Sequence, residues 1–556
     1  MSASESQESG EVRIGHSLNK KEEEFVAKRR RDIQQSLEKL HIYCGEVPNI
    51  ALLGSGGGER AMVGLMGSLD QLQKTGLLDC ILYLSGVSGS TWCMASLYQE
   101  PDWSTKLETV KDKIIDRLSG PGVSWADAFA KLKKYYYGKD IFSLTDFWAA
   151  MFVTDYVKEI DEHTLTDHWD QLSKDPFPIY TVIDKQCKQD EDADPWFEFT
   201  PYEAGYSLTR AFVETSSFGS EFDNGCKIKK QPEMDMLYLQ GLCGSALADG
   251  DEIRKFLWEK IKDFFHQFLL KRETGMFEKM RKEDPDCSPT DEFYQLLMDL
   301  VDMNLSVLNG IDPSGLDESI RTKLTKLSEG KHFQIRKLNL TDKEAAKQSM
   351  EQYTVDVCND LSLRFSFWSF DIFLSICKCM AQWKWGSNYD FLHNMTDEAV
   401  PSTLQKSETR DYEDGGLLLN SPYFSVLREE RDIDLIISLD FSDDKDPFTT
   451  VRDTAETCRK LNIPFPDINI PSGDVKKPKD FYVFKGQNAP TVIHIALFNV
   501  VNCGDEFEKY KETYHTFQGP YSAEMIDDLM DVAGKNITNN KDNLKEQICL
   551  SKKKTQ

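Results

Sequence analysis

Two segments near the N-terminus share one pattern of apolar and polar positions. In each, a short apolar run ends at glycines, and apolar side chains at helical spacing follow. In chain order, the pattern predicts a strand at 49–53, a turn at 54–58, a helix at 60–74, a strand at 80–85, a turn at 86–90 and a helix at 91–98. Successive strand–turn–helix units are typical of an α/β sheet with parallel strands.

The same patterns predict further elements along the chain. They are a helix over 20–40, strands at 179–183, 433–439 and 491–497, and a helical stretch over 523–548 with a polar break at 536–540. The expected fold class is therefore α/β, with a central, mostly parallel sheet and flanking helices.

The remaining segments set the expected domain boundaries. Residues 1–18 are polar and predicted to be disordered, and residues 551–556 form a basic tail. Residues 270–348 are rich in charge and only weakly periodic, so we interpret them as an inserted, partly mobile region that acts as a lid or cap. Residues 19–550 are otherwise expected to form one domain.

Composition narrows the classes of function. The 556 residues carry a net charge of −27, which disfavours a nucleic-acid binder. The 13 cysteines show no zinc-binding spacing, so reduced thiols in a cytoplasmic protein are the simplest expectation. The polar N-terminus predicts no signal peptide, and the chain has no apolar run long enough to span a membrane. No cofactor or metal is expected, and the protein is predicted to act as a monomer.

Residues 86–90, Gly-Val-Ser-Gly-Ser, carry the first candidate for chemistry. A serine hydroxyl is a weak nucleophile, and a glycine-flanked turn from strand to helix lifts it out of the sheet and keeps its approach clear. The turn also places Ser88 at a helix N-terminus, where backbone N–H groups favour developing negative charge. An ordinary connection is the alternative, since Ser90 stands where this motif usually ends in glycine. The pattern favours Ser88 as the nucleophile of an acyl-hydrolase.

The preceding glycine loop allows two interpretations. Acyl transfer needs N–H donors aimed at the oxyanion, and Gly57 and Gly58 offer unobstructed backbone N–H groups before a helix. A nucleotide phosphate loop is the rival, but residues 54–60 lack its Gly-Lys-Ser/Thr ending and the dinucleotide spacing of glycines. Arg60 is a permanent cation beside the loop and suits a lipid phosphate, unless it is an ordinary surface arginine of the helix.

The base that activates Ser88 stays open at this point. A lipase-type triad in the order Ser, Asp, His is satisfied by Ser88, Asp414 and His494. His494, however, lies in the apolar, strand-like run 491–497, where a buried core histidine is expected. His393 is a weaker candidate because it precedes Asp414. The other interpretation is a Ser–Asp dyad, in which Asp414, at a glycine turn, takes the proton directly.

Several short segments together resemble a known family. They occur at residues 54–62, 84–92, 196–201, 218–220, 244–246, 414–417, 420–423, 434–438 and 463–466. In this order they resemble the catalytic domain of the group IV cytosolic phospholipase A2 family, most of all its gamma type. The resemblance covers roughly residues 20–550.

The resemblance implies a patatin-like α/β core with a Ser–Asp dyad, and it assigns the base to Asp414. Ser88 matches the family nucleophile, Gly57 and Gly58 match the oxyanion hole, and Arg60 matches the arginine that steadies the substrate phosphate. The implied substrate is a glycerophospholipid in a membrane surface. Phospholipase A2 activity at the sn-2 ester is expected, with lysophospholipase and transacylase activity beside it.

The chain also departs from the family pattern. Residues 414–416 are Asp-Gly-Gly where the family commonly has Asp-Ser-Gly, and Glu59 replaces a residue that is usually apolar. A negative charge at Glu59, next to Arg60, is expected to weaken phosphate binding. The glycine loop begins at Gly54, which leaves no room for a preceding calcium-binding lipid module, so calcium-independent activity is expected. The C-terminal residues show no prenylation box.

An enzyme that acts on a bilayer needs a surface that meets it. Residues 365–385 combine Phe and Trp with Lys378 and Lys384, which suits a headgroup boundary, and burial of these rings in a core is the alternative. We expect a cytoplasmic protein that contacts intracellular membranes transiently. Two non-enzymatic alternatives remain, namely a lipid-binding protein that has lost turnover and a nucleotide-binding protein that uses the glycine loop.

Overall fold

The computed structural model describes residues 12–167, 174–188, 194–245, 250–273, 291–327, 335–364, 368–516 and 518–551. The chain divides into two compact units. The first comprises Met1–Ile141, Trp148–Ala246 and Gly386–Gln556, and the second comprises Phe142–Phe147 and Leu247–Trp385. The insert expected at 270–348 falls within the second unit.

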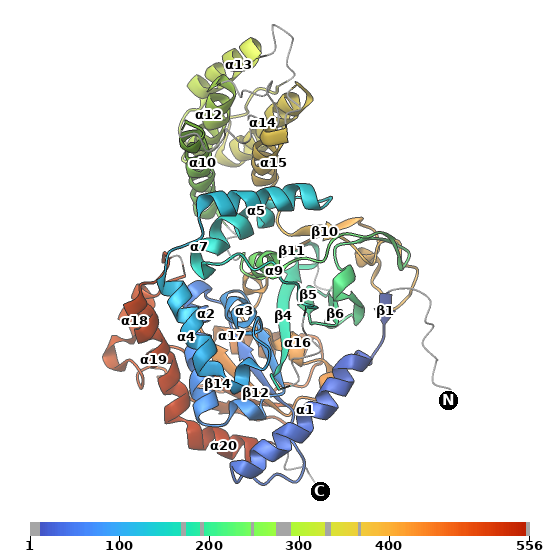
Figure 1. The fold of residues 1–556 in the computed structure, drawn as a ribbon, viewed down its shortest axis with the longest axis vertical. Helices are drawn as coiled ribbons and strands as arrows, with labels where there is room; N and C mark the ends of the chain where they lie inside the picture. The colour runs from blue at the N-terminus through green and yellow to red at the C-terminus, as the bar shows by residue number, and fades with distance from the viewer. Residues whose placement is uncertain are drawn as a thin grey trace. The chain divides into compact units, whose positions relative to one another are not determined.

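The strands belong almost entirely to one large sheet in the first unit (Figure 1). They are β1 (Val12–Ile14), β2 (Ile50–Gly54), β3 (Tyr83–Gly86), β4 (Phe177–Asp184), β5 (Trp196–Phe199), β6 (Glu203–Tyr206), β7 (Ala211–Glu214), β8 (Glu221–Asp223), β9 (Cys226–Lys229), β10 (Ser387–Tyr389), β11 (Thr409–Asp414), β12 (Leu435–Asp440), β13 (Tyr482–Phe484) and β14 (Thr491–Ala496). Only β8 and β9, among the described strands, form a separate hairpin.

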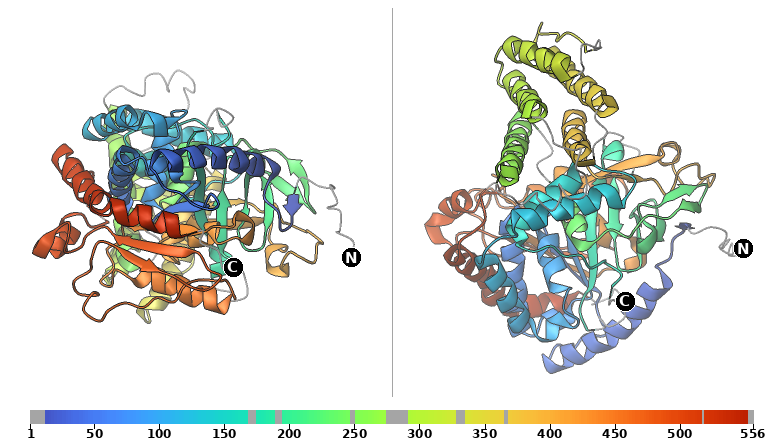
Figure 2. Two further views of the ribbon diagram at one scale, coloured as in Figure 1. Left: turned by 90° about the horizontal axis from the view of Figure 1, so that it is seen from below. Right: turned by 45° about the horizontal axis from the view of Figure 1, so that its top comes forward.

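The helices of the first unit lie on both faces of this sheet (Figures 1 and 2). They are α1 (Lys20–Lys39), α2 (Gly58–Lys74), α3 (Gly89–Leu97), α4 (Leu107–Ser119), α5 (Trp125–Gly138), α7 (Thr154–Val157), α8 (Lys185–Lys188), α9 (Met236–Cys243), α16 (Tyr423–Val426), α17 (Thr449–Lys460), α18 (Phe507–Thr513), α19 (Ala523–Asn539) and α20 (Lys541–Leu550). The short helix α6 (Leu144–Trp148) falls at the boundary between the units.

The sheet has a parallel centre and antiparallel edges. Its order is β1-β7-β6-β5-β4-β3-β2-β12-β14-β13, and neighbours from β4 to β14 run parallel. The outer strands pair antiparallel, as β13 does with β14 and β5 with β4. The central strands are buried on both faces, as parallel strands covered by helices must be. The predicted α/β class with a mostly parallel central sheet is confirmed.

Most of the predicted elements are present with bounds shifted by a few residues. The expected helix over 20–40 is α1. The polar break expected at 536–540 is shorter, because α19 continues to Asn539 and Asn540 alone separates it from α20. The strand expected at 80–85 starts later, at Tyr83, because Leu78–Cys80 forms a 3-10 turn. The prediction of disorder to residue 18 is wrong for Val12–Ile14, which form β1 against β7. Residues 1–11 and 552–556 lie outside the described residues.

The second unit is helical and has an aromatic centre. Its helices are α10 (Asp251–Glu273), α12 (Asp291–Leu308), α13 (Ser314–Leu327), α14 (Lys343–Arg364) and α15 (Trp368–Gln382). The ring of Phe373 lies 4.7 Å from that of Phe268 and 5.2 Å from that of Phe265, between centroids. Phe370 lies 4.2 Å from Phe293. Helices of the charge-rich segment, such as α12, thus pack with α10 and α15 in a core within the second unit.

This core overturns the membrane-facing interpretation of residues 365–385. Phe370, Phe373, Trp383 and Trp385 are buried, and none is more than 9% exposed. Their aromatic surface is used for packing within the unit and is not available to a headgroup boundary. Phe365 and Phe367 lie outside the described residues.

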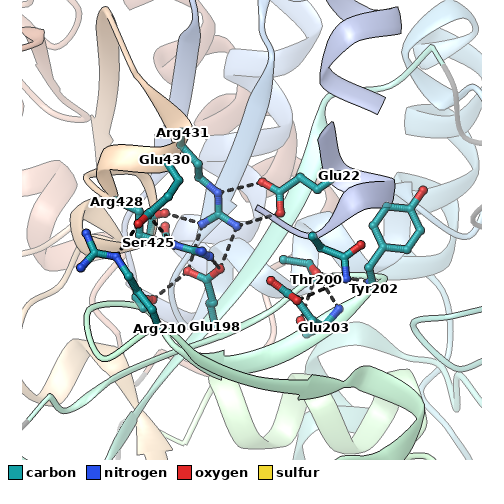
Figure 3. Close-up of polar contacts among 12 residues, drawn as sticks. Glu22, Glu198, Thr200, Tyr202, Glu203, Arg210, Ser425, Arg428, Glu430 and Arg431 are labelled. Carbon is teal, nitrogen blue, oxygen red and sulfur yellow. Dashed lines mark hydrogen bonds and ion pairs between the residues drawn. The ribbon is translucent and has the colours of Figure 1, made fainter. Parts of the chain in front are cut away.

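Four fully buried charged side chains join distant segments of the first unit (Figure 3). Glu198 of β5 accepts hydrogen bonds from Arg428 Nη1 and Arg431 Nη2, both at 2.8 Å. Arg431 Nε also donates to Glu22 of α1 at 2.9 Å, and Tyr83 of β3 donates to the same carboxylate. Buried charges persist only when they are paired and hydrogen-bonded, so these contacts fix α1, two strands and the segment after α16 relative to one another.

Replacing Glu198 with Gln should destabilise the first unit. Arg428 would then be left with Glu430 at 3.6 Å, and Arg431 with Glu22. We expect the free energy of unfolding to fall by about 3–5 kcal/mol in a chemical denaturation experiment at neutral pH. The exposed Glu214 on β7 provides the matched control, Glu214→Gln, which should change little.

The stability difference between wild type and Glu198→Gln should depend on pH. Burial raises the pKa of Glu198, but the guanidinium groups of Arg431 and Arg428 outweigh it and leave this pKa below its ordinary value. The stability that the charge contributes is therefore present above the unfolded-state pKa, about 4.3, and is lost as the pH falls further. A difference between wild type and Glu198→Gln that stays constant from pH 7 to below pH 4 would contradict this role.

Candidate active site

Two glycine turns meet at one edge of the sheet. Strands β2 and β3 are parallel neighbours, and Gly54 pairs with Gly86 at their carboxyl ends. The chain therefore leaves both strands at the same level, and each turn leads into a helix, α2 after the first and α3 after the second. The carboxyl ends of parallel strands are where α/β proteins place their ligand sites.

Ser88 occupies the turn between β3 and α3 in a strained conformation. Its backbone has φ 51° and ψ −125°, it precedes the first residue of α3, and the residue is 4% exposed. Non-glycine residues rarely adopt this region, and such strain persists only where the surroundings enforce it. The turn thus has the geometry predicted for a nucleophile held above the end of a strand.

The first turn fits against the second because both carry glycines. A Cβ atom on Gly89 would lie 1.8 Å from the carbonyl oxygen of Gly58, and one on Gly56 would lie 2.9 Å from Cβ of Ser88. Gly57, with φ 148°, and Gly58, with φ 58°, also take backbone conformations that favour glycine. The glycine loop that leads into α2 is therefore brought next to the turn that carries Ser88.

Ser90 explains the departure from the usual glycine at the end of the turn. Its Oγ donates a hydrogen bond of 2.6 Å to the carbonyl oxygen of Ser55 in the glycine loop. Ser55 Oγ in turn accepts from the N–H of Phe441 at the end of β12. The hydroxyl of Ser90 thus joins the two turns, which a glycine at this position would not do.

Asp414 reaches the same edge from the other end of the sequence. The residue ends β11, which pairs with β4 through Asp414 and Val182. One edge of β4 pairs with β5, so β3 and β11 must share its other edge, β3 as far as Tyr180 and β11 from Val182 onward. Partners two residues apart along a strand are separated by about 7 Å, so Asp414 lies just beyond the end of β3.

Asp414 is fully buried at the start of a 3-10 turn. Its Oδ1 accepts a hydrogen bond of 2.8 Å from the N–H of Gly416. A Cβ atom on Gly415 would lie 3.6 Å from both methyl groups of Val87, the residue before Ser88. The loop that carries Asp414 therefore packs on the turn that carries Ser88.

Asn420 joins the loop of Asp414 to the glycine loop, a role that our sequence analysis missed. Its Oδ1 accepts from the N–H of Gly56 at 3.1 Å, and its Nδ2 donates to the carbonyl oxygen of Gly56 at 3.3 Å. A Cβ atom on Gly416 would lie 2.9 Å from the same Oδ1. The sequence signal was the family-like segment 420–423, which begins at Asn420, but the role of its side chain follows only from these contacts.

The two histidines considered as bases form hydrogen bonds with residues other than Ser88. His494 is 1% exposed on β14, its Nε2 lies 2.8 Å from the carbonyl oxygen of Pro447, and burial lowers its pKa. Strands β12 and β2 separate β14 from β3, which places His494 about 14 Å from the end of β3. His393 takes part in a turn in which its N–H donates to the carbonyl oxygen of Asp390.

Arg60 is buried and bonded to protein groups rather than to solvent. The side chain is 1% exposed; its Nε donates to Phe441 O at 2.7 Å and its Nη1 to Tyr514 O at 2.6 Å. Nη2 donates to Thr516 Oγ1 at 3.3 Å, and Asp443 forms an ion pair with Nη1 at 3.4 Å. The interpretation as an ordinary surface arginine is wrong.

A comparison with known proteins identifies the family. A family model described as a lysophospholipase catalytic domain matches residues 50–295. Cytosolic phospholipase A2 gamma of Mus musculus is 31% identical over 96% of this chain and 91% of its own length. The chain belongs to the cytosolic phospholipase A2 family of lipid ester hydrolases. The human gamma protein is also 31% identical, over 97% of this chain and 96% of its own length.

A solved structure of the same family agrees with the fold. Human GIVD cytosolic phospholipase A2 superposes with a TM-score of 0.64 at 21% sequence identity, covering 98% of this chain and 66% of the other chain. This chain thus spans about two thirds of that cytosolic phospholipase A2. In the part of this chain that the structure describes, no helix combines the length and apolar character needed to span a membrane.

The contacts of Asn420 yield a prediction for this cytosolic phospholipase A2 family member. Asn420→Ala should free Gly56 and let the glycine loop move away from Ser88, so we expect ester hydrolysis to fall about 10–100-fold. The measurement is the rate on a soluble ester, together with the thermal unfolding midpoint. Asn543→Ala, at an exposed position of α20, is the control. Full activity of Asn420→Ala would show that Asn420 does not hold the loop.

Proposed function

We propose that the protein is a phospholipase A2 that cleaves the sn-2 ester of glycerophospholipids through a Ser88–Asp414 dyad. The observation that carries the proposal is the pairing of both β3 and β11 with one edge of β4, which brings Asp414 next to Ser88. The turn at Ser88 and the glycines beside it have the form that acyl transfer needs. The family supplies the lipid ester as the class of substrate.

The reaction follows from the roles of these groups. Asp414 accepts the hydroxyl proton while Ser88 Oγ attacks the ester carbonyl carbon, and the N–H groups of Gly57 and Gly58 stabilise the oxyanion. The ester C–O bond then breaks, and the lysophospholipid alkoxide leaves with the proton from Asp414. Water, deprotonated by Asp414, attacks the acyl–Ser88 ester, releases the fatty acid and restores Ser88.

The same intermediate accounts for two further activities. A lysophospholipid that enters in place of the diacyl lipid gives lysophospholipase activity, and a second lipid that replaces water gives transacylation. We propose that turnover is independent of calcium, because the scheme assigns a protein group to each charge. The Asp414 carboxylate takes the proton, backbone N–H groups stabilise the oxyanion, and the Arg60 guanidinium attracts the phosphate. We also propose a monomer in the cytoplasm that contacts intracellular membranes transiently, with the charge-rich insert at residues 270–348 as a lid or cap.

The role of Arg60 in this proposal is to attract the substrate phosphate. Its guanidinium is a permanent cation near Gly57, since a Cβ atom on that glycine would lie 3.0 Å from Nη2. Its present bonds to Phe441, Tyr514 and Asp443 compete with a phosphate for the same N–H groups. Arg60 could therefore bind the substrate phosphate or support the glycine loop. Comparing substrates with and without a phosphate distinguishes these two functions.

Arg60→Lys should lower the rate on phospholipid more than the rate on a neutral ester. Lysine keeps the charge but loses the fork of donors, and we expect a selective loss of about 10-fold in kcat/KM for phospholipid. The measurement compares a short-chain phospholipid with a phosphate-free ester of the same acyl chain. Equal losses on both substrates would assign Arg60 to the support of the loop alone.

Ser88→Ala and Asp414→Asn test the dyad itself. Each should reduce release of labelled sn-2 fatty acid by at least about 1,000-fold, because the reaction loses its nucleophile or its base. Asp411→Asn, three residues earlier on β11, controls for changes in the strand, and His494→Ala should retain turnover. A calcium chelator should leave the wild-type rate unchanged. Normal activity of Asp414→Asn together with an inactive His494→Ala would replace the dyad by a triad.

A non-catalytic lipid-binding protein is the second candidate. The observation in its favour is that Ser88 is only 4% exposed. A fluorophosphonate probe distinguishes the two functions, since an activated serine forms a covalent adduct with it. Failure to label Ser88 in the wild-type protein would favour lipid binding without turnover.

A further inference from the structure

A segment from the C-terminal part of the chain lies against the glycine loop. We call residues 514–516 and 518–521 the C-terminal strap. The carbonyl oxygen of Thr516 would be 3.4 Å from a Cβ atom on Gly58, and Tyr521 OH donates to the carbonyl oxygen of Tyr514 at 3.4 Å. Helix α19, which follows the strap, packs along α2. The strap therefore borders the loop that carries the proposed oxyanion hole.

Two neighbouring side chains of α2 bind this strap. Arg60 donates to the carbonyl oxygen of Tyr514, and Glu59 Oε2 accepts a hydrogen bond of 3.0 Å from the N–H of Tyr521. Glu59 is 3% exposed although it is a charged residue type. The bond to Tyr521 joins residues 462 positions apart in the sequence, at the first turn of the helix that begins at Gly58.

We propose that Glu59 is a positioning residue for the oxyanion hole, holding the C-terminal strap against Gly57 and Gly58 through its bond to the Tyr521 N–H. The proposal rests on the proposed acyl-transfer function of the site. It concerns the residue that departs from the apolar type usual in the family. In this role the carboxyl group acts as a hydrogen-bond acceptor and not as a charge that opposes Arg60.

The surroundings of Glu59 favour its neutral form. Burial raises its pKa to about 8, against smaller opposing effects of the Tyr521 N–H and of Lys158. Tyr156 and Tyr521 also interact with Glu59, and Arg60 is paired with Asp443. Lys111 of α4 pairs with Asp70, farther along α2. Near pH 7 the side chain is therefore mostly uncharged and accepts the bond from Tyr521.

Ionisation of Glu59 would place a buried negative charge beside the oxyanion hole. Such a charge raises the energy of a developing oxyanion and favours solvation of the loop, so the reactivity of Ser88 should fall as the pH rises through about 8. Gln at this position accepts the same hydrogen bond and cannot ionise. Ala removes the bond at every pH.

The test is the rate of Ser88 labelling by a fluorophosphonate probe between pH 6 and pH 9.5. Wild type should lose rate above pH 8, Glu59→Gln should match wild type at pH 7 and keep its rate above pH 8, and Glu59→Ala should be about 10–100-fold slower throughout. Glu524→Gln, at an exposed position in the first turn of α19, should follow the wild-type profile. Wild type and Glu59→Gln with the same profile would overturn the proposal.

A stability measurement keeps the test decisive if Glu59→Ala fails to fold. Because the folded-state pKa of Glu59 is raised, its protonation favours the folded state, and this contribution is lost as the pH rises from about 4.5 to about 8. Glu59→Gln should therefore gain in thermal unfolding midpoint over wild type across that range. A difference independent of pH would overturn the proposal. Absence of any wild-type labelling would instead contradict the proposed acyl-transfer function.

Discussion

The close approach of two strand-to-helix turns is the constraint on which the site depends. A methyl group on Gly89 would overlap the carbonyl oxygen of Gly58, and one on Gly56 would press on the side chains of Ser88 and Asn420. Packing at this density leaves no alternative position for either backbone. The strained φ of Ser88 is thus maintained by its neighbours, in the way that functional strain generally is.

The rest of the site is brought to these turns from distant parts of the sequence. Strand β4 accepts both β3 and β11 along one edge, and this shared edge places Asp414 beyond the end of β3. Asn420 then fastens the loop after Asp414 to Gly56. Behind the sheet, the ion pairs of Arg428 and Arg431 fix the following segment to β5 and α1 (Figure 3).

Buried charge has two different roles in this protein. In the group around Glu198, carboxylates and guanidinium groups balance one another, so burial is compatible with full ionisation. Arg60 follows the same rule through Asp443 and two carbonyl oxygens. Glu59 instead accepts a hydrogen bond from the backbone N–H of Tyr521, and burial raises its pKa to about 8. In the sequence, Glu59 and Arg60 are neighbours of opposite charge. In the structure, Arg60 is paired with Asp443, whereas burial favours the neutral form of Glu59.

The sequence by itself determined the parallel core, the turn at Ser88 and the glycine loop, because hydrophobic periodicity and glycine placement are local properties of the chain. The choice of Asp414 over His494 came from a resemblance and not from spacing. Only the tertiary structure decided the links made by Ser90, Asn420 and Tyr521, the burial of Phe370 and Phe373, and the extent of the second unit. These features depend on contacts between residues far apart in sequence, which no local pattern encodes.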